Sequence, residues 1–557
     1  MFACSVGLLR RALPALVCVA ILLAGHTLAR AQGVTTGSMA GIVQDAQGLA
    51  IPGATVVARH EPSGTTYEAV SREDGRWSIL GMRVGGPDSV TASLAGFQDS
   101  VVRELTVNLG VATDVAVKLG TVAVEETVTV TAQSDPVFSS ERTGAATAVS
   151  REALASLPTI NQRIQDITRL TPQAGGNNEF AGQDNRMNNI TIDGSSFNNS
   201  FGLAGVPGER TGVAPISLDA IEQVQVSIAP YDVRQGNFVG ANVNAVTRSG
   251  ANNFAGSFYH RWRDDSMVGT EPKGLAYNPG SFSFRNTGGW ASGPIVRNRA
   301  FFFFNMEDDA RTEPGTTFRA NTGGETVGGN VTRVLASDLD ALSAFLKTKY
   351  GYDTGPYQGY DHETPARRYL VKGDWNLNAS NKIVVRYNHL DSDTDVLLSN
   401  SSSLGFGTRR SNTTGLNFQN SNYKIKENIR SIVGEWNSVY GANMTNNMIV
   451  GYTKQDESRG SLGTFFPFVD ILSGGSVYTS FGFEPFTPNN ELRYNTFQFQ
   501  DNFSRFGTKH TLTFGYTAEK YRSENVFFPG SQSVYTFNSL QDFYASANGD
   551  PNVTVFR

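Results

Sequence analysis

The second half of the chain contains long segments in which apolar and polar residues alternate, and this pattern restricts the fold more than any other feature. In the segment RYLVKGDWNL, the apolar side chains would share one face of a strand and the polar side chains the other. Similar runs lie at residues 382–389, 448–455, 496–503 and 510–519. About ten alternating residues are typical of a transmembrane β-strand, whereas strands in soluble sandwiches usually have about 5 to 6 residues. The residues after 250 are therefore predicted to begin an antiparallel membrane barrel.

The first residues have the pattern of a secretory signal peptide. Two arginines precede an apolar run at residues 12–24, and the small-residue sequence Ala29-Arg30-Ala31 follows it. The apolar run is too short to span a membrane as a helix, so residues 1–31 are predicted to be removed. Both cysteines of the chain lie inside this segment. The mature protein is therefore expected to have no disulfide and no thiolate metal site.

The composition supports an exported, β-rich protein. The chain has 58 Gly, 35 Phe and 19 Tyr, and no stretch after residue 31 approaches the roughly 18 apolar residues of a spanning helix. Such a protein is either secreted or an outer-membrane barrel. The net charge is only -5, and no block rich in Lys and Arg stands out, so nucleic acid is not an expected partner.

Residues 32–120 are predicted to form a small β-sandwich. Short alternating runs at residues 54–57, 77–80, 90–93, 101–107 and 113–117 are separated by turn residues such as Pro52-Gly53 and Asp74-Gly75. The residues GIVQDAQGLAIPGATVVA, DGRWSIL and LAGFQD resemble the carboxypeptidase regulatory-like domain, which implies a sandwich of the transthyretin or immunoglobulin-like type. The six histidines form neither an H-x-x-E nor an H-E-x-x-H pair, so no metal site and no metallopeptidase activity are expected.

Residues 134–250 have a mixed pattern that predicts an α+β domain. Ser150 is placed to cap a short helix over REALASLP, a second helix is expected in NQRIQDITRL, and strands are expected at NNITIDG, IEQVQVSIA and VNAVTRSG. The segment ITIDGSSFNNSFG and the long stretch at residues 217–259 resemble the plug domain of TonB-dependent outer-membrane receptors. The resemblance implies that Asp193 and Gly194 form a turn of the plug.

A short Thr/Val alternation lies in residues 121–133, between the predicted sandwich and the plug. The segment ETVTVTA resembles a TonB box and comprises Glu126, Thr127, Val128, Thr129, Val130, Thr131 and Ala132. The resemblance implies that TonB takes up this coupling segment as an added strand, bound through main-chain hydrogen bonds. Alternatively, residues 127–131 form the last strand of the sandwich or the first strand of the plug.

The residues after 250 resemble the early barrel strands of Oar-like proteins, most clearly in TGGWASGPIVRNRAFFFFNMEDDART. Within the four phenylalanines, Phe301 and Phe303 are expected on one face, and Phe302 and Phe304 on the other, where the plug would cover them. The polar tracts at residues 321–358 and 397–424 are expected to be extracellular loops. About nine strands are expected in residues 251–557, against roughly 22 in plugged transporter barrels. The chain is thus expected to be the N-terminal portion of a longer protein with a partial barrel.

The resemblance implies an Oar-like, TonB-dependent outer-membrane receptor that takes up a bulky ligand, whether siderophore, glycan or peptide. Its expected partners are TonB with the inner-membrane energising complex, outer-membrane lipid and an unknown extracellular ligand. The sandwich and the coupling segment would lie in the periplasm. No catalytic residues, cofactor or metal are expected, because no nucleophile, base and orienting group form a pattern. The alternative is a cell-surface or secreted adhesion protein that binds carbohydrate or protein through its sandwich.

Overall fold

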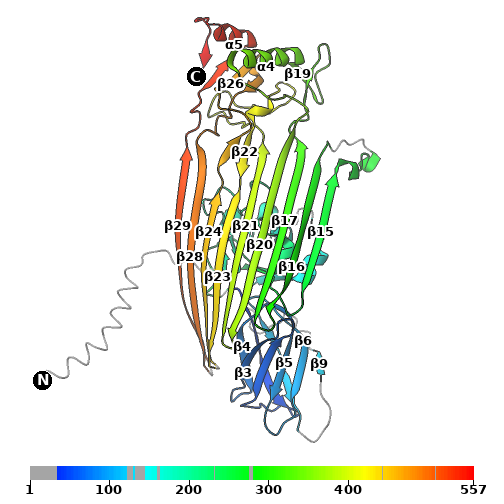
Figure 1. Ribbon diagram of the computed structural model, residues 1–557, viewed down its shortest axis with the longest axis vertical. Helices are drawn as coiled ribbons and strands as arrows, with labels where there is room; N and C mark the ends of the chain where they lie inside the picture. The colour runs from blue at the N-terminus through cyan, green and yellow to red at the C-terminus, as the bar shows by residue number, and fades with distance from the viewer. Residues whose placement is uncertain are drawn as a thin grey trace, which may run out of the picture.

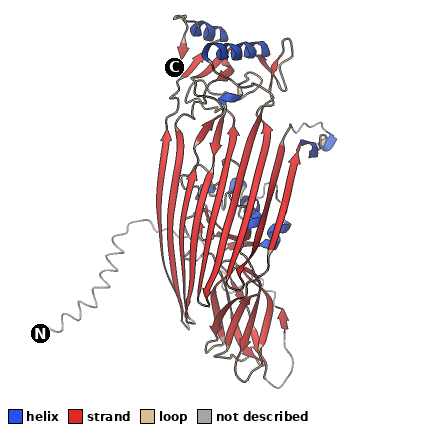
Figure 2. Cartoon of the chain, viewed as in Figure 1, coloured by secondary structure: helices blue, strands red, loops and turns tan. Residues whose placement is uncertain are grey.

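The computed structural model describes residues 34–121, 129–131, 145–157, 159, 163–230, 232–274, 280–441, 443–507 and 510–556. The predicted signal peptide lies outside the described residues. Three regions follow one another along the long axis of the molecule, namely a sandwich at one end, a tall sheet with an α+β region packed against it, and a cap at the other end (Figure 1). Strands predominate throughout (Figure 2).

The sandwich, residues 34–121, contains two sheets around its own apolar core. Its strands are β1 (Gly37–Asp45), β2 (Thr55–His60), β3 (Thr65–Val70), β4 (Arg76–Met82), β5 (Gly85–Ser93), β6 (Ser100–Val107), β7 (Ala112–Asp114) and β8 (Val117–Leu119). One sheet has the order β3-β2-β5-β6-β9, in which β9 is Thr129–Thr131, and in the other β1 pairs with β4, β7 and β8. Trp77, 2% exposed, lies in the core between them. The run predicted at residues 113–117 is split between β7 and β8, because its middle crosses β1 closely at Gly41.

A carboxyl group is buried in this sandwich without a partner. Asp88 in β5 is 1% exposed, and neither of its oxygens has a hydrogen-bond partner within the described residues. Burial raises the pKa of Asp88 to about 8, although Arg83 opposes the shift. His60 lies opposite Asp88 on β2, and burial, helped by Arg83 and Lys382, lowers its pKa to about 3. Asp88 and His60 therefore change the free energy of unfolding in opposite directions as the pH rises.

The stability of the sandwich should fall between pH 6.5 and 8. Up to about 8, folded Asp88 keeps a proton that the unfolded chain has released, so the free energy of unfolding falls as pH rises. His60 has the reverse effect, but only up to its unfolded pKa of 6.5. Above that pH the Asp88 effect predominates, and we expect a loss of about 1 kcal/mol by pH 8. Asp88→Asn should abolish this loss.

Hydrogen exchange of the sandwich amides in the full chain in detergent, corrected for the intrinsic pH dependence of exchange, measures this effect, because Lys382 of the barrel belongs to the surroundings of His60. The exposed Asp99→Asn variant is the matched control and should retain the wild-type pH dependence. An equal free energy of unfolding at pH 6.5 and pH 8 in the wild type would contradict the assignment of Asp88.

The plug, residues 145–250, has a five-stranded sheet of order β10-β13-β14-β11-β12. Its elements are β10 (Ala145–Ser150), α2 (Arg151–Ser156), α3 (Ile164–Thr168), η2 (Gly176–Asn178), η3 (Asn185–Met187), β11 (Asn189–Ile192), β12 (Ser195–Ser196), η4 (Leu218–Ala220), β13 (Ile221–Ile228) and β14 (Asn242–Thr247). Both predicted helices are present, and the Ser150 hydroxyl accepts a hydrogen bond from the Ala153 N–H, as expected for an N-cap.

The tall sheet consists of nine long antiparallel strands within the described residues. They are β15 (Ala255–Asp264), β16 (Ser283–Val296), β17 (Ala300–Pro314), β20 (Asp361–Asn378), β21 (Asn381–Val396), β23 (Asn428–Tyr440), β24 (Met444–Asp456), β28 (Asn490–Phe506) and β29 (Thr511–Phe527). The expected alternation is confirmed, because Trp375 and Phe514 are exposed on the outer face while Lys372 is buried on the inner face. The sheet curves around the plug (Figure 1).

The phenylalanine run alternates as predicted, but with the faces exchanged. Phe301 and Phe303 are buried on the inner face, and Phe303 belongs to the same apolar cluster as the plug. Phe304 is 39% exposed on the outer face. The prediction that the plug covers Phe302 and Phe304 was therefore wrong. Alternation alone cannot tell the inner from the outer face, which depends on the register with neighbouring strands.

The tracts predicted as polar loops form part of a folded cap. Its elements are β18 (Arg319–Asn321), β19 (Val331–Leu335), α4 (Ala336–Tyr350), η7 (Gln419–Ser421), β26 (Phe468–Ser473), β27 (Ser476–Phe481), β30 (Val534–Phe537), α5 (Leu540–Ala547) and β31 (Val555–Phe556). The short elements η5 (Asp265–Met267), η6 (Pro272–Gly274), β22 (Tyr423–Lys426) and β25 (Arg459–Ser461) extend from the barrel strands. Leu342, Leu346 and Phe543 are among the apolar residues buried in the core of the cap.

Candidate functional site

Part of the predicted coupling segment lies on the edge of the sandwich. Thr129–Thr131 forms β9, which pairs in parallel with Val101–Arg103 of β6. Glu126, Thr127, Val128 and Ala132 lie outside the described residues. The backbone of residues 129–131 thus adopts the strand considered as the alternative interpretation. A strand at a sheet edge keeps one side available for a further strand, so the role in coupling stays a prediction.

The predicted Asp193-Gly194 turn lies at the interface between the plug and the barrel. Both residues have positive φ angles, 46° and 73°, as a tight turn after β11 requires. The Asp193 carboxylate accepts hydrogen bonds from the Thr247 N–H at 2.8 Å and from the Thr247 hydroxyl at 2.6 Å. The carboxylate therefore fastens this turn to the end of β14.

Two barrel cations face the same carboxylate. Lys372 Nζ of β20 and Arg386 Nη1 of β21 each lie 3.5 Å from an oxygen of Asp193. Lys372 also donates to the Thr247 carbonyl at 2.9 Å, and Arg386 donates to the Ile192 carbonyl at 3.2 Å. All three charged side chains are buried, so each depends on the others to offset its loss of hydration. We call these three residues the Asp193 cluster.

A second contact between the plug and the barrel uses two buried carboxylates near the cap. Glu427 accepts hydrogen bonds from the backbone N–H groups of Gly208 and Thr211, both at 2.9 Å. Glu457 accepts from the Asn199 amide at 2.9 Å and pairs with Arg210 at 3.3 Å. The plug loop at residues 199–211 is therefore held by Glu427, which directly precedes β23, and by Glu457, which directly follows β24.

A third contact is centred on a barrel ion pair. Glu307 of β17 pairs with Arg368 of β20 and accepts a hydrogen bond from the Ser217 hydroxyl of the plug at 2.7 Å. Arg368 also donates to the Ala214 carbonyl at 3.2 Å. At each of the three contacts, polar barrel side chains reach plug polar groups. Such contacts fix the position of the plug on the barrel sheet through hydrogen bonds and ion pairs.

The sequence pattern did not reveal Lys372, Arg386, Glu427 and Glu457 as contacts of the plug. Each contact joins residues at least 125 positions apart, as with Lys372 and Thr247 or Glu427 and Gly208. The available signal was a charged residue on the inner face of an alternating strand, which applies to Lys372 and Arg386. That signal does not identify the plug residues that these barrel side chains contact.

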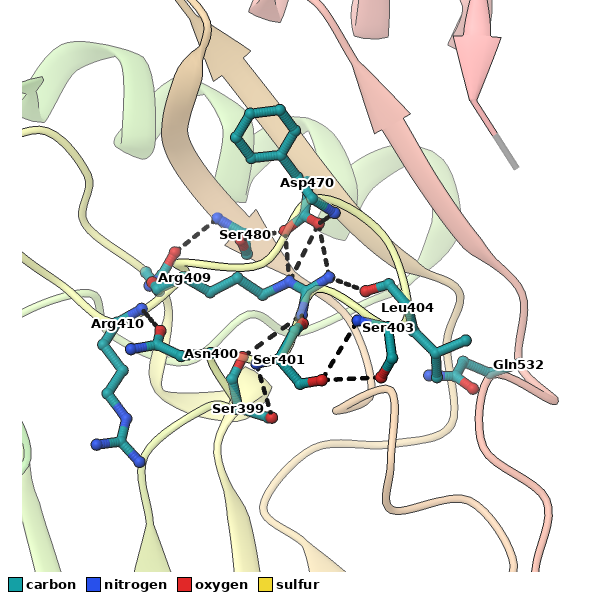
Figure 3. A network of polar contacts seen from close by, with 12 residues as sticks. Ser399, Asn400, Ser401, Ser403, Leu404, Arg409, Arg410, Asp470, Ser480 and Gln532 are labelled. Carbon is teal, nitrogen blue, oxygen red and sulfur yellow. Dashed lines mark hydrogen bonds and ion pairs between the residues drawn. The ribbon is translucent and has the colours of Figure 1, made fainter.

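A buried ion pair organises the cap. Arg409 and Asp470 are both essentially inaccessible to solvent, and Arg409 Nε and Nη2 each lie 3.0 Å from an Asp470 oxygen (Figure 3). Arg409 also donates to the Ser401 carbonyl at 2.9 Å, and Ser480 donates its hydroxyl proton to Asp470 at 2.8 Å. The ion pair therefore ties the segment before β22 to β26 and β27.

The described residues contain no group of three His, Cys, Asp or Glu side chains that could hold a metal ion. Among the helices that the structure describes, none is both long enough and apolar enough to cross a membrane.

Two family models match the chain. The carboxypeptidase regulatory-like domain matches residues 38–120. The outer membrane beta barrel domain matches residues 246–332 and 341–552, together more than half of the chain. The first match agrees with the sandwich, and the second covers the tall sheet and the cap.

Known proteins with similar sequences or folds are transporters and receptors. Over 150 residues, the chain is 27% identical to the TonB-dependent transporter Oar of Myxococcus xanthus, which is 25% of this chain and 13% of that protein. The outer membrane transporter YddB of Escherichia coli has a TM-score of 0.48 at 12% identity, covering 71% of this chain and 50% of that chain. The siderophore receptor PirA of Acinetobacter baumannii has a TM-score of 0.41 at 13% identity, covering 69% and 48%. The matched part spans half or less of these proteins.

Proposed function

Because the chain belongs to the outer-membrane β-barrel family, we propose that it acts as a TonB-dependent transporter that takes up a bulky ligand through a plugged barrel. The protein is located in the outer membrane. The observation that carries the proposal is the plug itself, which packs on the inner face of the barrel sheet and is bound there by buried barrel side chains. A barrel filled in this way needs a device that moves the plug before a bulky ligand can pass.

The coupling segment Glu126–Ala132 supplies that device in the proposal. It precedes β10, which begins at Ala145 and pairs along its full length with the plug strand β13. TonB, energised from the inner membrane, would bind the segment as an added strand and pull on the chain that enters the plug. The similarity to a protein named as a TonB-dependent transporter supports this partner.

The polar contacts of the plug suit such a movement. A hydrogen bond to a charged group contributes about 1.5–3 kcal/mol to stability, far less than its strength in isolation, because a broken bond is replaced by one to solvent. The contacts of Glu427 with Gly208 and Thr211 are of this kind, since they bind main-chain N–H groups. A pulling force could therefore break them in succession and later allow them to re-form.

Val128→Pro tests the coupling segment. Proline removes a main-chain donor from the strand that TonB would pair with, so we expect binding to the purified C-terminal domain of TonB to weaken at least tenfold. Binding is measured by titration of the full chain in detergent. Ser139→Pro, seven positions beyond the segment in the sequence, is the matched control and should bind as the wild type does. Equal binding of Val128→Pro and wild type would refute the assignment.

A further inference from the structure

The sandwich is docked on the plug through its β6–β7 connection. The Leu109 N–H donates to Gln223 Oε1 at 2.6 Å, and Gln225 Nε2 donates to the Leu109 carbonyl at 2.8 Å. Gln223 also donates to Asn108 Oδ1 at 3.0 Å. The Leu109 side chain is fully buried in an apolar cluster with a second sandwich residue and with Val246 of the plug. Both glutamines belong to β13, which lies between β10 and β14 in the plug sheet.

The same sandwich also contacts the nearer ends of three barrel strands, which we call the mouth of the barrel. Asn376 of β20 donates to the Thr65 hydroxyl at 3.0 Å. Lys382 Nζ of β21 lies 3.3 Å from the centre of the Tyr67 ring, a close cation–π contact. The Thr35 hydroxyl donates to the Glu435 carboxylate of β23. The sandwich therefore bridges the plug and three neighbouring barrel strands.

Glycines in the sandwich allow this close approach. A Cβ atom at Gly64 would lie 2.4 Å from Asn298 of the barrel, and one at Gly85 would lie 2.8 Å from Glu222 of the plug. Both distances are shorter than a van der Waals contact, so a larger residue would displace the side chain of Asn298 or Glu222. Both glycines also have positive φ angles, 66° and 109°. The fit between the sandwich and the mouth is thus specific to the turn residues of this chain.

Part of the coupling segment is fastened to this docked sandwich. β9 pairs with Val101–Arg103 near the start of β6, and β6 ends at Val107, directly before the residues that bind β13. Strand β6 therefore connects residues 129–131 to the residues that bind β13 of the plug. A pull on the coupling segment would act on β6 as well as on β10.

We propose that the sandwich is a periplasmic latch, which holds the plug and the barrel together at rest and undocks when TonB pulls on the coupling segment. This inference rests on the proposed function and adds the role of the sandwich in it. In the resting state the latch opposes plug movement through the contacts of Leu109 with Gln223 and Gln225. Undocking removes these contacts and frees β13 to shift.

Cysteine labelling in cells tests the latch, because both native cysteines lie in the predicted signal peptide. Leu109→Cys places a thiol in the buried interface and keeps both backbone hydrogen bonds of the residue. A small biotin maleimide should label Cys at 109 at least fivefold faster in energised cells than in cells treated with a proton uncoupler. Ala92→Cys, in the sandwich core, is the matched control and should stay unlabelled in both conditions. Gln225→Glu, which removes the donor to Leu109, should make labelling fast without energy.

The outcomes separate the latch from the proposed function. Adding Val128→Pro should abolish the energy-dependent labelling at position 109. Slow labelling that energy does not change, with TonB binding intact, would overturn the latch and leave the proposed function standing. Slow labelling that energy does not change, together with a loss of TonB binding, would overturn both the latch and the proposed function. Fast labelling in both conditions, or labelling of Cys at 92 in parallel, would also overturn the latch, because the sandwich would then be undocked at rest or unfolding.

Discussion

Arg409→Met should lower the free energy of unfolding of the cap by about 3–5 kcal/mol, since it leaves the buried Asp470 carboxylate without its cation. The substitution also removes the donor to the Ser401 carbonyl, which the Arg409 guanidinium contacts at 2.9 Å. The segment before β22 would then lose its attachment to β26. We expect the cap to become locally unfolded while the barrel sheet below it remains intact.

Hydrogen exchange measured on the full chain in detergent distinguishes these regions. The amides of β26 and β27 should lose protection in Arg409→Met, and those of β23 and β24 should keep theirs. Arg410→Met is the matched control, because Arg410 is the exposed neighbour of Arg409 and should tolerate the change. The double variant Arg409→Met with Asp470→Asn should recover part of the protection, since no unpaired charge remains. Unchanged exchange in the single variant would show that the ion pair does not hold the cap together.

Asp193→Ala should destabilise the contact between the plug turn and the barrel by about 3–5 kcal/mol. The substitution removes the carboxylate that faces the buried cations Lys372 and Arg386. The variant also removes both acceptors of Thr247, at the end of β14. The affected contacts join the plug turn to two barrel strands. We therefore expect the plug to loosen from the barrel before either part unfolds.

The exchange rate of the Thr247 amide reports this effect directly, since its N–H is bonded to Asp193 at 2.8 Å. The rate should rise by at least 100-fold, the equivalent of about 3 kcal/mol. Asp184→Ala is the control within the plug. Its carboxylate forms an exposed pair with Arg186, which water screens, so the substitution should leave the Thr247 exchange rate unchanged. If the Thr247 amide were as well protected in Asp193→Ala as in the wild type, the Asp193 cluster would not hold the plug on the barrel.

Local patterns predicted most of the elements correctly. The strands β20 and β29 follow from strict alternation, and α2 follows from Ser150 at its N-cap. Helix α4 was missed within a tract interpreted as a polar loop. Its N-cap residue, Leu335, makes no side-chain capping bond, so the usual start signal is absent. The helix is stabilised instead by packing on the core of the cap.

The sequence by itself determined the strands, which residues of each strand share a face, and the turns at residues such as Gly53 and Gly194. These features depend on neighbours a few positions away. The tertiary structure alone decided which face of Phe301–Phe304 points inward, where residues 129–131 pair, and which cations surround Asp193. A buried charge is tolerated only beside its partners, and those partners are brought together by the register of distant strands. That register arises from the packing of the whole sheet around the plug and has no local signature in the chain.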